Sequence, residues 1–190
     1  MTLRRLPLLV FGLVLASTAV LSPIGCSAAG VSLQNTGTVT VYFSPDGGAV
    51  DAIVQAIQSA RTRVWLAGYE FTHPRIARAL AQAVDPRRHV DVRVVLDQGN
   101  ARSSYTAATY LVRAGVPVRI DWTHPLMHQK TIVIDDDIVG MGSMNFTRAG
   151  DEKNSENWNV FRGNPPLAQL YAQAFLQLHA QSTPYQSKGQ

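Results

Sequence analysis

Two residues with complementary chemistry, His128 and Lys130, are separated by one residue in a segment that we interpret as a β-strand. Alternate residues of a strand face the same side, so the imidazole and the ammonium point the same way, roughly 7 Å apart along the chain. A lysine can hold an anionic oxygen, and a histidine, whose pKa lies near neutrality, can act as nucleophile, base or acid. The pair is therefore suited to attack on a phosphate.

Further polar residues follow at short intervals: Asp135, Gly142, Ser143, Asn145 and Glu156. Asp135 lies on the opposite face of the predicted strand from His128, so we assign it a structural role. An isolated His-x-Lys pair is usually just a solvated strand edge. When the His-x-Lys pair is accompanied by the other five residues at these intervals, a functional site explains the pattern better than chance does.

The spacing H-x-K-x4-D-x6-G-S-x-N resembles the signature of the phospholipase D superfamily. Other segments resemble the small secreted bacterial endonucleases of that superfamily, namely Val41–Pro45, Tyr69–Thr72, Ile76–Leu80 and Asn154–Asn157. One departure is Glu70, where a small residue is more usual. The resemblance implies a phosphodiesterase with an α-β-α fold.

The resemblance also implies roles for individual residues. His128 would attack phosphorus to give a phosphohistidine, while Lys130 and Asn145 hold the phosphate oxygens. Ser143 would help to bind the substrate, and the turn at Gly142 would let backbone N–H groups approach it. Glu156 would accept a hydrogen bond from the ring N–H of a His128 and fix its tautomer.

One copy of the motif supplies only one histidine and one lysine. Larger members of the superfamily carry two copies. No second copy begins at His73, His89 or His124, because the required lysine and aspartate do not follow these residues. A two-fold homodimer would bring two motifs together across its axis. We therefore predict a homodimer with a composite active site, in which the second His128 protonates the leaving oxygen and then activates water.

Residues 1–29 have the pattern of an export signal, with two arginines followed by the apolar run Leu6–Val20. The run is too short to span a membrane comfortably, so we predict no stable membrane span after processing. Small residues at 27–29 suit an ordinary signal peptidase, whereas Cys26 leaves a lipid anchor as an alternative. The predicted location is periplasmic or secreted. Because Cys26 is the only cysteine, the exported domain contains no internal disulfide.

Charge gives little support for a global attraction to nucleic acid. The net charge of +4 falls to +2 once the two leader arginines are removed, so any attraction of phosphate must be local. Asp136 and Asp137 could suggest a divalent cation, but consecutive acids in a hairpin are more simply turn formers. We therefore predict neither a metal nor a cofactor.

The predicted organisation is a linker at 30–37, one domain at 38–182 and a polar tail at 183–190. Strands are predicted at 38–43, 63–69, 90–96, 118–122, 128–134, 138–141 and 155–161. Helices are predicted at 49–60, 74–83, 104–114 and 165–180. The alternation of strands and helices favours parallel early strands that are joined by right-handed crossover connections. The acidic turn at 135–137 favours an antiparallel hairpin of the strands at 128–134 and 138–141. The fold class is thus α/β, with a mixed, mostly parallel sheet flanked by helices.

Several less specific features have more than one interpretation. The loops holding Thr72 and His73, and residues 98–102, could border the pocket at the ends of parallel strands, or be ordinary polar loops. The three tryptophans favour core or dimer-interface positions over base stacking; they are Trp65, Trp122 and Trp158.

Three functions remain open. The leading one is a secreted, metal-independent endonuclease with little sequence preference. The second is a phospholipase D acting on phosphatidyl substrates, which is weaker because no interfacial apolar stretch follows the leader. The third, a non-catalytic DNA-binding module, is disfavoured by the intact motif.

Overall fold

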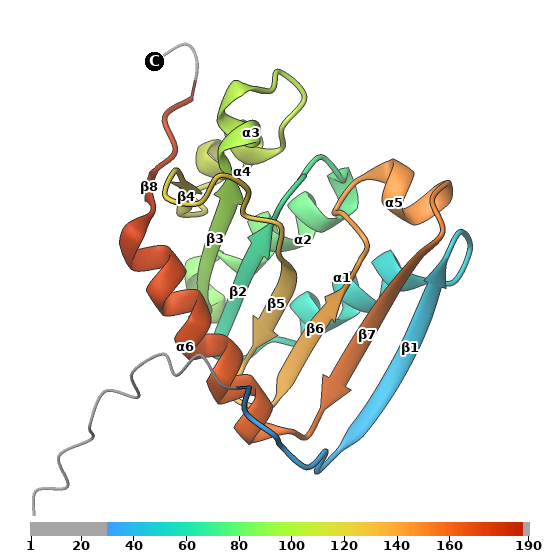
Figure 1. The fold of residues 1–190 in the computed structure, drawn as a ribbon. Helices are drawn as coiled ribbons and strands as arrows, with labels where there is room; N and C mark the ends of the chain where they lie inside the picture. The colour runs from blue at the N-terminus through green and yellow to red at the C-terminus, as the bar shows by residue number, and fades with distance from the viewer. Residues whose placement is uncertain (1–29, 188–190) are drawn as a thin grey trace, which may run out of the picture. The chain divides into compact units, whose positions relative to one another are not determined.

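Eight strands form one mixed sheet in the order β1-β7-β6-β5-β2-β3-β4-β8 (Figure 1). Their bounds are β1 Thr38–Ser44, β2 Arg63–Gly68, β3 Asp91–Asp97, β4 Val118–Asp121, β5 Lys130–Ile134, β6 Ile138–Gly142, β7 Glu156–Arg162 and β8 Thr183–Pro184. The structure, a computed structural model, describes residues 30–187, so the predicted export signal lies outside the described residues. Within 30–187, no helix has both the length and the apolar character needed to cross a bilayer.

Helices cover both faces of the sheet and bury two separate apolar clusters. Their bounds are α1 Ala49–Ser59, α2 Pro74–Ala83, α3 Gln98–Arg102, α4 Ala108–Arg113, α5 Arg148–Glu152 and α6 Pro165–Gln181, with a 3-10 turn at Pro86–Arg88. Side chains of α1, α2 and α4 share one cluster with Leu66 and Ile132, whereas α6 packs with Trp65 and Val133 in the other. Neighbouring strand residues thus enter opposite clusters, as the two-residue period of a strand requires.

Local sequence signals account for where the helices begin and end. Pro74 and Pro165 stand in the first turns of α2 and α6, where a missing N–H breaks no helical hydrogen bond. The Asn164 side chain accepts a hydrogen bond from the Leu167 N–H and caps α6. Gly115 follows α4 with a φ of 85°, the left-handed conformation that ends a helix at little cost.

The prediction of a mostly parallel sheet is wrong. Only the β2–β3 and β3–β4 pairs are parallel, and the other five pairings are antiparallel. The first two strands do run in the same direction, as Figure 1 shows, but they are not neighbours. The hairpin of β5 and β6, together with β7, lies between β1 and β2. The expected parallel contact of β1 with β2 is therefore replaced by antiparallel contacts with these three strands.

Two further segments differ from the sequence prediction. The helix expected at 104–114 is shortened to α4 at 108–113, and a separate helix, α3, forms before it, where the Asp97 side chain accepts a hydrogen bond from the Gly99 N–H. The segment expected to be a polar tail instead forms β8 on the edge of β4. Tyr185 is buried behind it, with its hydroxyl 2.8 Å from the Thr109 hydroxyl.

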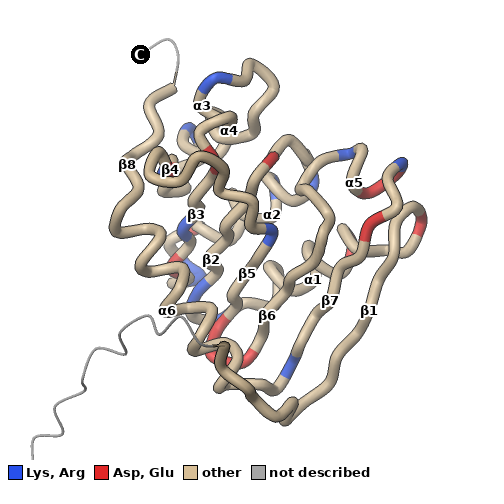
Figure 2. Tube along the Cα trace, viewed as in Figure 1, with Lys and Arg blue, Asp and Glu red and all other residues tan. Residues whose placement is uncertain are grey.

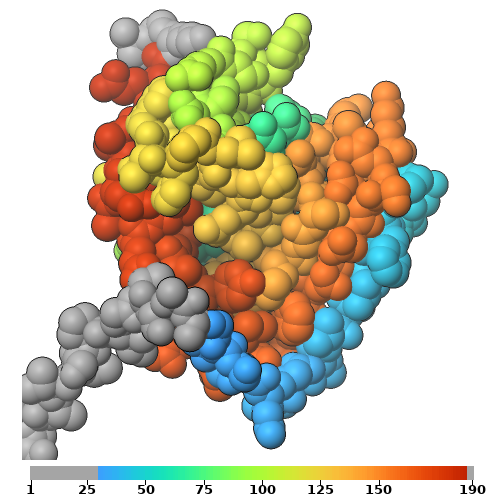
Figure 3. Space-filling view, viewed as in Figure 1, coloured from blue at the N-terminus to red at the C-terminus, as the bar shows by residue number. Residues whose placement is uncertain are grey.

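The face of the sheet that carries α6 has an exposed apolar stripe on β1. Val39, Val41 and Phe43 alternate along the edge strand and are all exposed. Val39 pairs with Phe161, which in turn pairs with Val139 beneath α6, so the stripe lies on the α6 side. Figure 3 shows α6 crossing this face beside the surface formed by β6 and β7. Along the coloured part of the trace, Lys and Arg are interspersed with Asp and Glu (Figure 2).

Candidate active site

His128 lies immediately before β5, at the end of the sheet where β2 finishes. Its side chain is exposed, and its ring centroid is 4.6 Å from that of Tyr69, at an angle of 54°. The Tyr69 N–H donates to the Gln129 carbonyl, so the backbone after β2 and the backbone before β5 are held together. An exposed imidazole supported on one side by an aromatic ring can meet a substrate from the other.

Lys130 begins β5 and is only 5% exposed. Its ammonium donates to the His128 carbonyl oxygen at 3.0 Å and lies 4.8 Å from the centroid of the Tyr69 ring. Burial lowers the pKa of Lys130, while the nearby carboxylates of Glu156 and Glu70 oppose that effect. A desolvated cation has few water contacts to lose when it binds a phosphate oxygen.

Ser143 and Glu156 form the second part of the site. The Ser143 hydroxyl donates to Glu156 Oε2 at 2.6 Å and accepts from the Asn157 N–H at 3.1 Å. Gly142 comes just before, and a Cβ there would lie 2.1 Å from the Asn157 carbonyl oxygen, so only glycine fits this approach of β6 to β7. The hydroxyl is thus fixed in place at the end of two strands.

Asn145 is half-buried beside Glu70. Its Nδ2 donates to Glu70 Oε2 at 3.4 Å, and the Phe146 N–H donates to the Glu70 carbonyl. Asn145 Oδ1 is buried and has no hydrogen-bond partner among residues 30–187. Nδ2 carries a second N–H, and this is the part of the amide that could donate to an oxygen of a bound substrate.

The hydrogen bond expected between Glu156 and a His128 is not formed within the chain. In the part of the chain that the structure describes, the Glu156 carboxylate accepts instead from Ser143 and from Asn154 Nδ2, the latter at 3.1 Å. Glu156 nevertheless raises the pKa of Lys130 against the effect of burial, which places the two groups in one electrostatic environment. The structure therefore gathers the predicted catalytic and substrate-binding residues at one end of the sheet, but with a different partner for the Glu156 carboxylate.

Asp135 stands at the other end of β5, away from His128. Its carboxylate accepts hydrogen bonds from the backbone N–H groups of Arg61, Thr62 and Arg63 at 2.8–3.2 Å. Burial opposes its ionisation, but these donors outweigh burial and hold the pKa of Asp135 below its ordinary value. The side chain ties the turn after β5 to the start of β2, and Asp136 in the same turn forms an ion pair with Arg63 at 2.9 Å.

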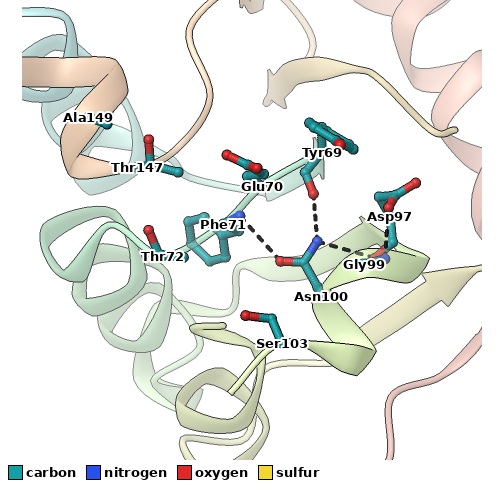
Figure 4. Close-up of a pocket in the computed structure, with 10 residues that line it drawn as sticks. All are labelled: Tyr69, Glu70, Phe71, Thr72, Asp97, Gly99, Asn100, Ser103, Thr147 and Ala149. Atoms are coloured by element: carbon teal, nitrogen blue, oxygen red, sulfur yellow. Dashed lines mark hydrogen bonds between the residues drawn. The ribbon is translucent and has the colours of Figure 1, made fainter. Parts of the chain in front are cut away.

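Three supporting residues were not among the predicted site residues: Tyr69, Asp97 and Asn100. Buried Asp97 accepts from the Met127 N–H at 2.9 Å, immediately before His128. Asn100 accepts from the Phe71 N–H and donates to the Tyr69 carbonyl oxygen, joining the end of β2 to α3 (Figure 4). Polar residues directly after two parallel strands were the signal that could have identified them.

A cavity of about 330 Å³ adjoins this support. Its lining includes Tyr69, Glu70, Thr72, Asn100 and Ser103, which Figure 4 draws around the opening. The segments that follow β2 and β3 therefore border a cavity, but the lining of this cavity does not include His128 or Lys130. His73 is the exception, because it is buried and caps α2 by accepting from the Arg75 N–H. Burial lowers the pKa of His73, consistent with a neutral ring that accepts this bond.

The three tryptophans occupy different environments. Trp65 and Trp158 are buried in the two apolar clusters on opposite faces of the sheet, in agreement with core positions. Trp122, after β4, is 48% exposed, and it is therefore not a core residue of the described chain.

Comparisons with known proteins agree with this geometry. The family described as cardiolipin synthase, PLD-like domain, matches residues 53–179. A phospholipase D of Rickettsia bellii is 32% identical over 152 residues, which are 80% of this chain and 74% of that protein. The crystal structure of the phospholipase D family member Nuc from Salmonella typhimurium has a TM-score of 0.74 and 36% identity, covering 79% of this chain and 99% of Nuc. NucT from Helicobacter pylori has a TM-score of 0.69 and 22% identity, covering 78% of this chain and 99% of NucT, and shows the shared fold.

Proposed function

The chain belongs to the phospholipase D-like superfamily, and from this premise we propose that it is a metal-independent endonuclease that cuts DNA with little sequence preference. The observation that carries the proposal is that the exposed ring of His128 and the buried ammonium of Lys130 both lie against the ring of Tyr69. The likeness to Nuc over nearly the whole of that chain supports the small endonuclease branch. We also propose that the protein is exported.

In the first step, a ring nitrogen of one His128 attacks phosphorus. A P–N bond forms as the P–O bond to the leaving group breaks, and the partner's His128 gives a proton to the departing oxygen. In the second step, the partner's His128 takes a proton from water, whose oxygen attacks phosphorus. The P–N bond then breaks, which restores the free imidazole and releases the second product.

Fixed positive charge and hydrogen-bond donors would stabilise the phosphate oxygens in both steps. An ammonium has three N–H donors, and that of Lys130 directs one to the His128 carbonyl and faces the Tyr69 ring. A further donor can therefore serve a phosphate oxygen, together with the amide of Asn145. Two lysines across a dimer axis would supply charge of the kind that a metal ion brings in other phosphodiesterases.

We propose that the active species is a homodimer. Each chain carries one motif, and the exposed stripe of Val39, Val41 and Phe43 supports a contact with a second copy on the α6 face. Phe43 pairs with Asn157, next to Ser143 and Glu156, so the stripe ends at the site. Burying it in a symmetric contact would remove apolar surface from water and bring the two sites together. Glu156 could then reach the partner's His128.

Hydrolysis of phosphatidyl substrates is the alternative, and the Rickettsia relative named phospholipase D favours it. Both reactions use the same phosphoryl-transfer groups, so the site chemistry alone does not separate them.

A paired assay tests the proposal. Plasmid nicking and choline release from phosphatidylcholine are measured side by side in excess chelator. We expect nicking that persists in chelator and disappears in His128→Asn, whereas His89→Asn, at an exposed residue with a left-handed backbone that asparagine tolerates, should keep it. Nicking that vanishes with chelator would refute the metal-free mechanism, and choline release without nicking would favour the lipase.

A further inference from the structure

A shallow groove lies between the end of β4, α3 and the C-terminal segment. Its volume is about 490 Å³, and its lining includes Ala101, Ile120, Trp122, Pro184, Tyr185 and Gln186. The groove exists because β8 pairs with β4 and holds the C-terminal segment against the sheet as a wall. It therefore combines flat aromatic and apolar walls with an amide side chain.

Trp122 is the exposed aromatic group of this groove. Its side chain remains 48% exposed, and the guanidinium carbon of Arg102 lies 5.7 Å from its ring centroid. The loop after α3 carries a second exposed aromatic residue, Tyr105, at 85%. Exposed aromatic rings next to a guanidinium are the groups on which unpaired nucleic-acid bases stack, while the cation attracts the phosphate backbone.

Hydrogen bonds connect the groove to the candidate active site. Gln98 Nε2 donates to the carbonyl oxygens of His124 and Pro125 at 3.4 and 3.2 Å, and Asp97 holds the Met127 N–H. The loop from Trp122 to His128 is thus fixed at several points. Six residues of extended chain span at most about 20 Å, so the groove lies within a few nucleotides of the reacting phosphate. In Figure 3 the segments of α3 and of the β4–β5 loop adjoin each other on one surface.

We propose that this groove, called here the base-stacking groove, binds an unpaired base of the substrate strand a few nucleotides from the scissile phosphate. The proposal rests on the nuclease function proposed above, and it gives the enzyme a preference for single-stranded over duplex DNA. In a duplex the base faces are already stacked, so they are not available to Trp122 without melting the strand.

The charges around the groove favour a polynucleotide over other occupants. The Asp121 carboxylate, which follows Ile120, is fully buried, lies 2.7 Å from His124 Nδ1 and accepts from the Thr123 N–H, so it is not presented at the surface of the groove. Arg102 supplies positive charge at the groove, and Gln186 supplies both a donor and an acceptor for the edge of a base. An acyl chain would use neither of these polar groups.

The test compares Trp122→Ala with wild type on two substrates. The first is a labelled single-stranded oligonucleotide of about 20 nucleotides, and the second is bis(p-nitrophenyl) phosphate, which is too short to reach the groove from the reacting phosphate. We expect KM for the oligonucleotide to rise about 10-fold, with unchanged turnover of the small diester. Trp122→Phe should retain most of the oligonucleotide affinity. Tyr110→Ala is the matched control, because Tyr110 is equally exposed at 48% but lies on α4, outside the groove.

Binding is measured independently of turnover in a His128→Asn background, by fluorescence anisotropy of the same oligonucleotide. Adding Trp122→Ala should weaken binding by the same factor, about 10-fold. An unchanged affinity overturns the proposal, and so does an equal loss on the small diester, which would indicate a structural role. Loss of binding to phosphatidylcholine vesicles alone, or a change in molecular mass, would assign the groove to lipid or to a second copy. If wild type turns over the small diester but neither binds nor cuts oligonucleotide, the proposed nuclease function fails instead.

Discussion

At the scale of single residues, Lys130 combines a functional position with a cost in stability. Its ammonium is buried at the start of β5, and burial lowers its pKa even though three carboxylates, those of Glu156, Glu70 and Asp97, act in the opposite direction. A charge held in an environment that disfavours it weakens the folded state relative to a neutral side chain. Under the proposed function, contact with a phosphate oxygen would offset this cost when substrate binds.

We predict that Lys130→Met raises the free energy of unfolding by about 1 kcal/mol at neutral pH while abolishing phosphodiesterase activity. The unfolded chain binds more protons than the folded one between the lowered pKa and 10.5, so wild type gains stability as pH rises through that window. The advantage of the methionine variant should therefore shrink at alkaline pH. Urea denaturation at a series of pH values measures both effects. Lys153→Met, at an exposed lysine, serves as the control, and a methionine variant at position 130 that is less stable than wild type would contradict this explanation.

At the scale of elements, Asp135 joins the turn after β5 to the beginning of β2. It accepts hydrogen bonds from the backbone N–H groups of Arg61 and Thr62, which precede β2, and of Arg63, which begins it. One carboxylate therefore fixes the ends of two neighbouring strands. Asp135 has a φ of 49°, which asparagine also tolerates, and this permits a substitution that changes charge without forcing the backbone.

Asp135→Asn should lower the free energy of unfolding by about 1–3 kcal/mol at neutral pH, because charge-assisted hydrogen bonds are replaced by weaker ones. The folded-state pKa lies below 3.8, so the wild-type contribution is present above that pH and is lost as pH falls through the folded-state pKa. The difference between the two proteins should therefore narrow in acid, as measured by denaturant titration. Asp136→Asn, at a far more exposed partner of Arg63, should change stability by less than about 0.5 kcal/mol. A difference for Asp135→Asn that stays constant down to low pH would argue against ionisation as the cause.

The elements also show what the sequence could and could not predict. The alternation that places Lys130, Ile132 and Ile134 on one face is a local period, and it was predicted correctly. The position of β1 could not be predicted, because its neighbour β7 comes at the other end of the domain. The direction in which a strand runs follows from the element that connects it to the preceding strand. Which strands become neighbours in the sheet depends on where later segments of the chain are inserted.

The same distinction applies to the site. His128 and Lys130 were predicted together because they are two residues apart in one local segment, although β5 itself begins only at Lys130. The support from Tyr69 and Asp97 depends on strand order, which brings the ends of β2 and β3 next to the start of β5. The hydrogen bond of Glu156 to Ser143 joins two antiparallel strands, and no short sequence pattern specifies which side-chain donor is nearest.

At the scale of the whole molecule, the proposed homodimer makes catalysis depend on two intact chains. We predict that exchange of subunits between equal amounts of wild type and His128→Asn leaves about one quarter of the activity of the same total amount of wild type, because only wild-type pairs act. Independent chains would leave about one half. The control is the same mixture assayed before exchange, and light scattering on the same samples gives the molecular mass. A monomeric mass in a fully active sample would exclude the composite site.

The pairing of the first strand with β7 has a consequence for the order of assembly. Thr38 pairs with Arg162, so the strand that leaves the ribosome first must wait for nearly the whole domain before it finds its neighbour. Contacts between such distant segments form late, since a long loop has to close first. Until then Val39, Val41 and Phe43 belong to an unpaired strand, the kind of segment that chaperones protect from aggregation.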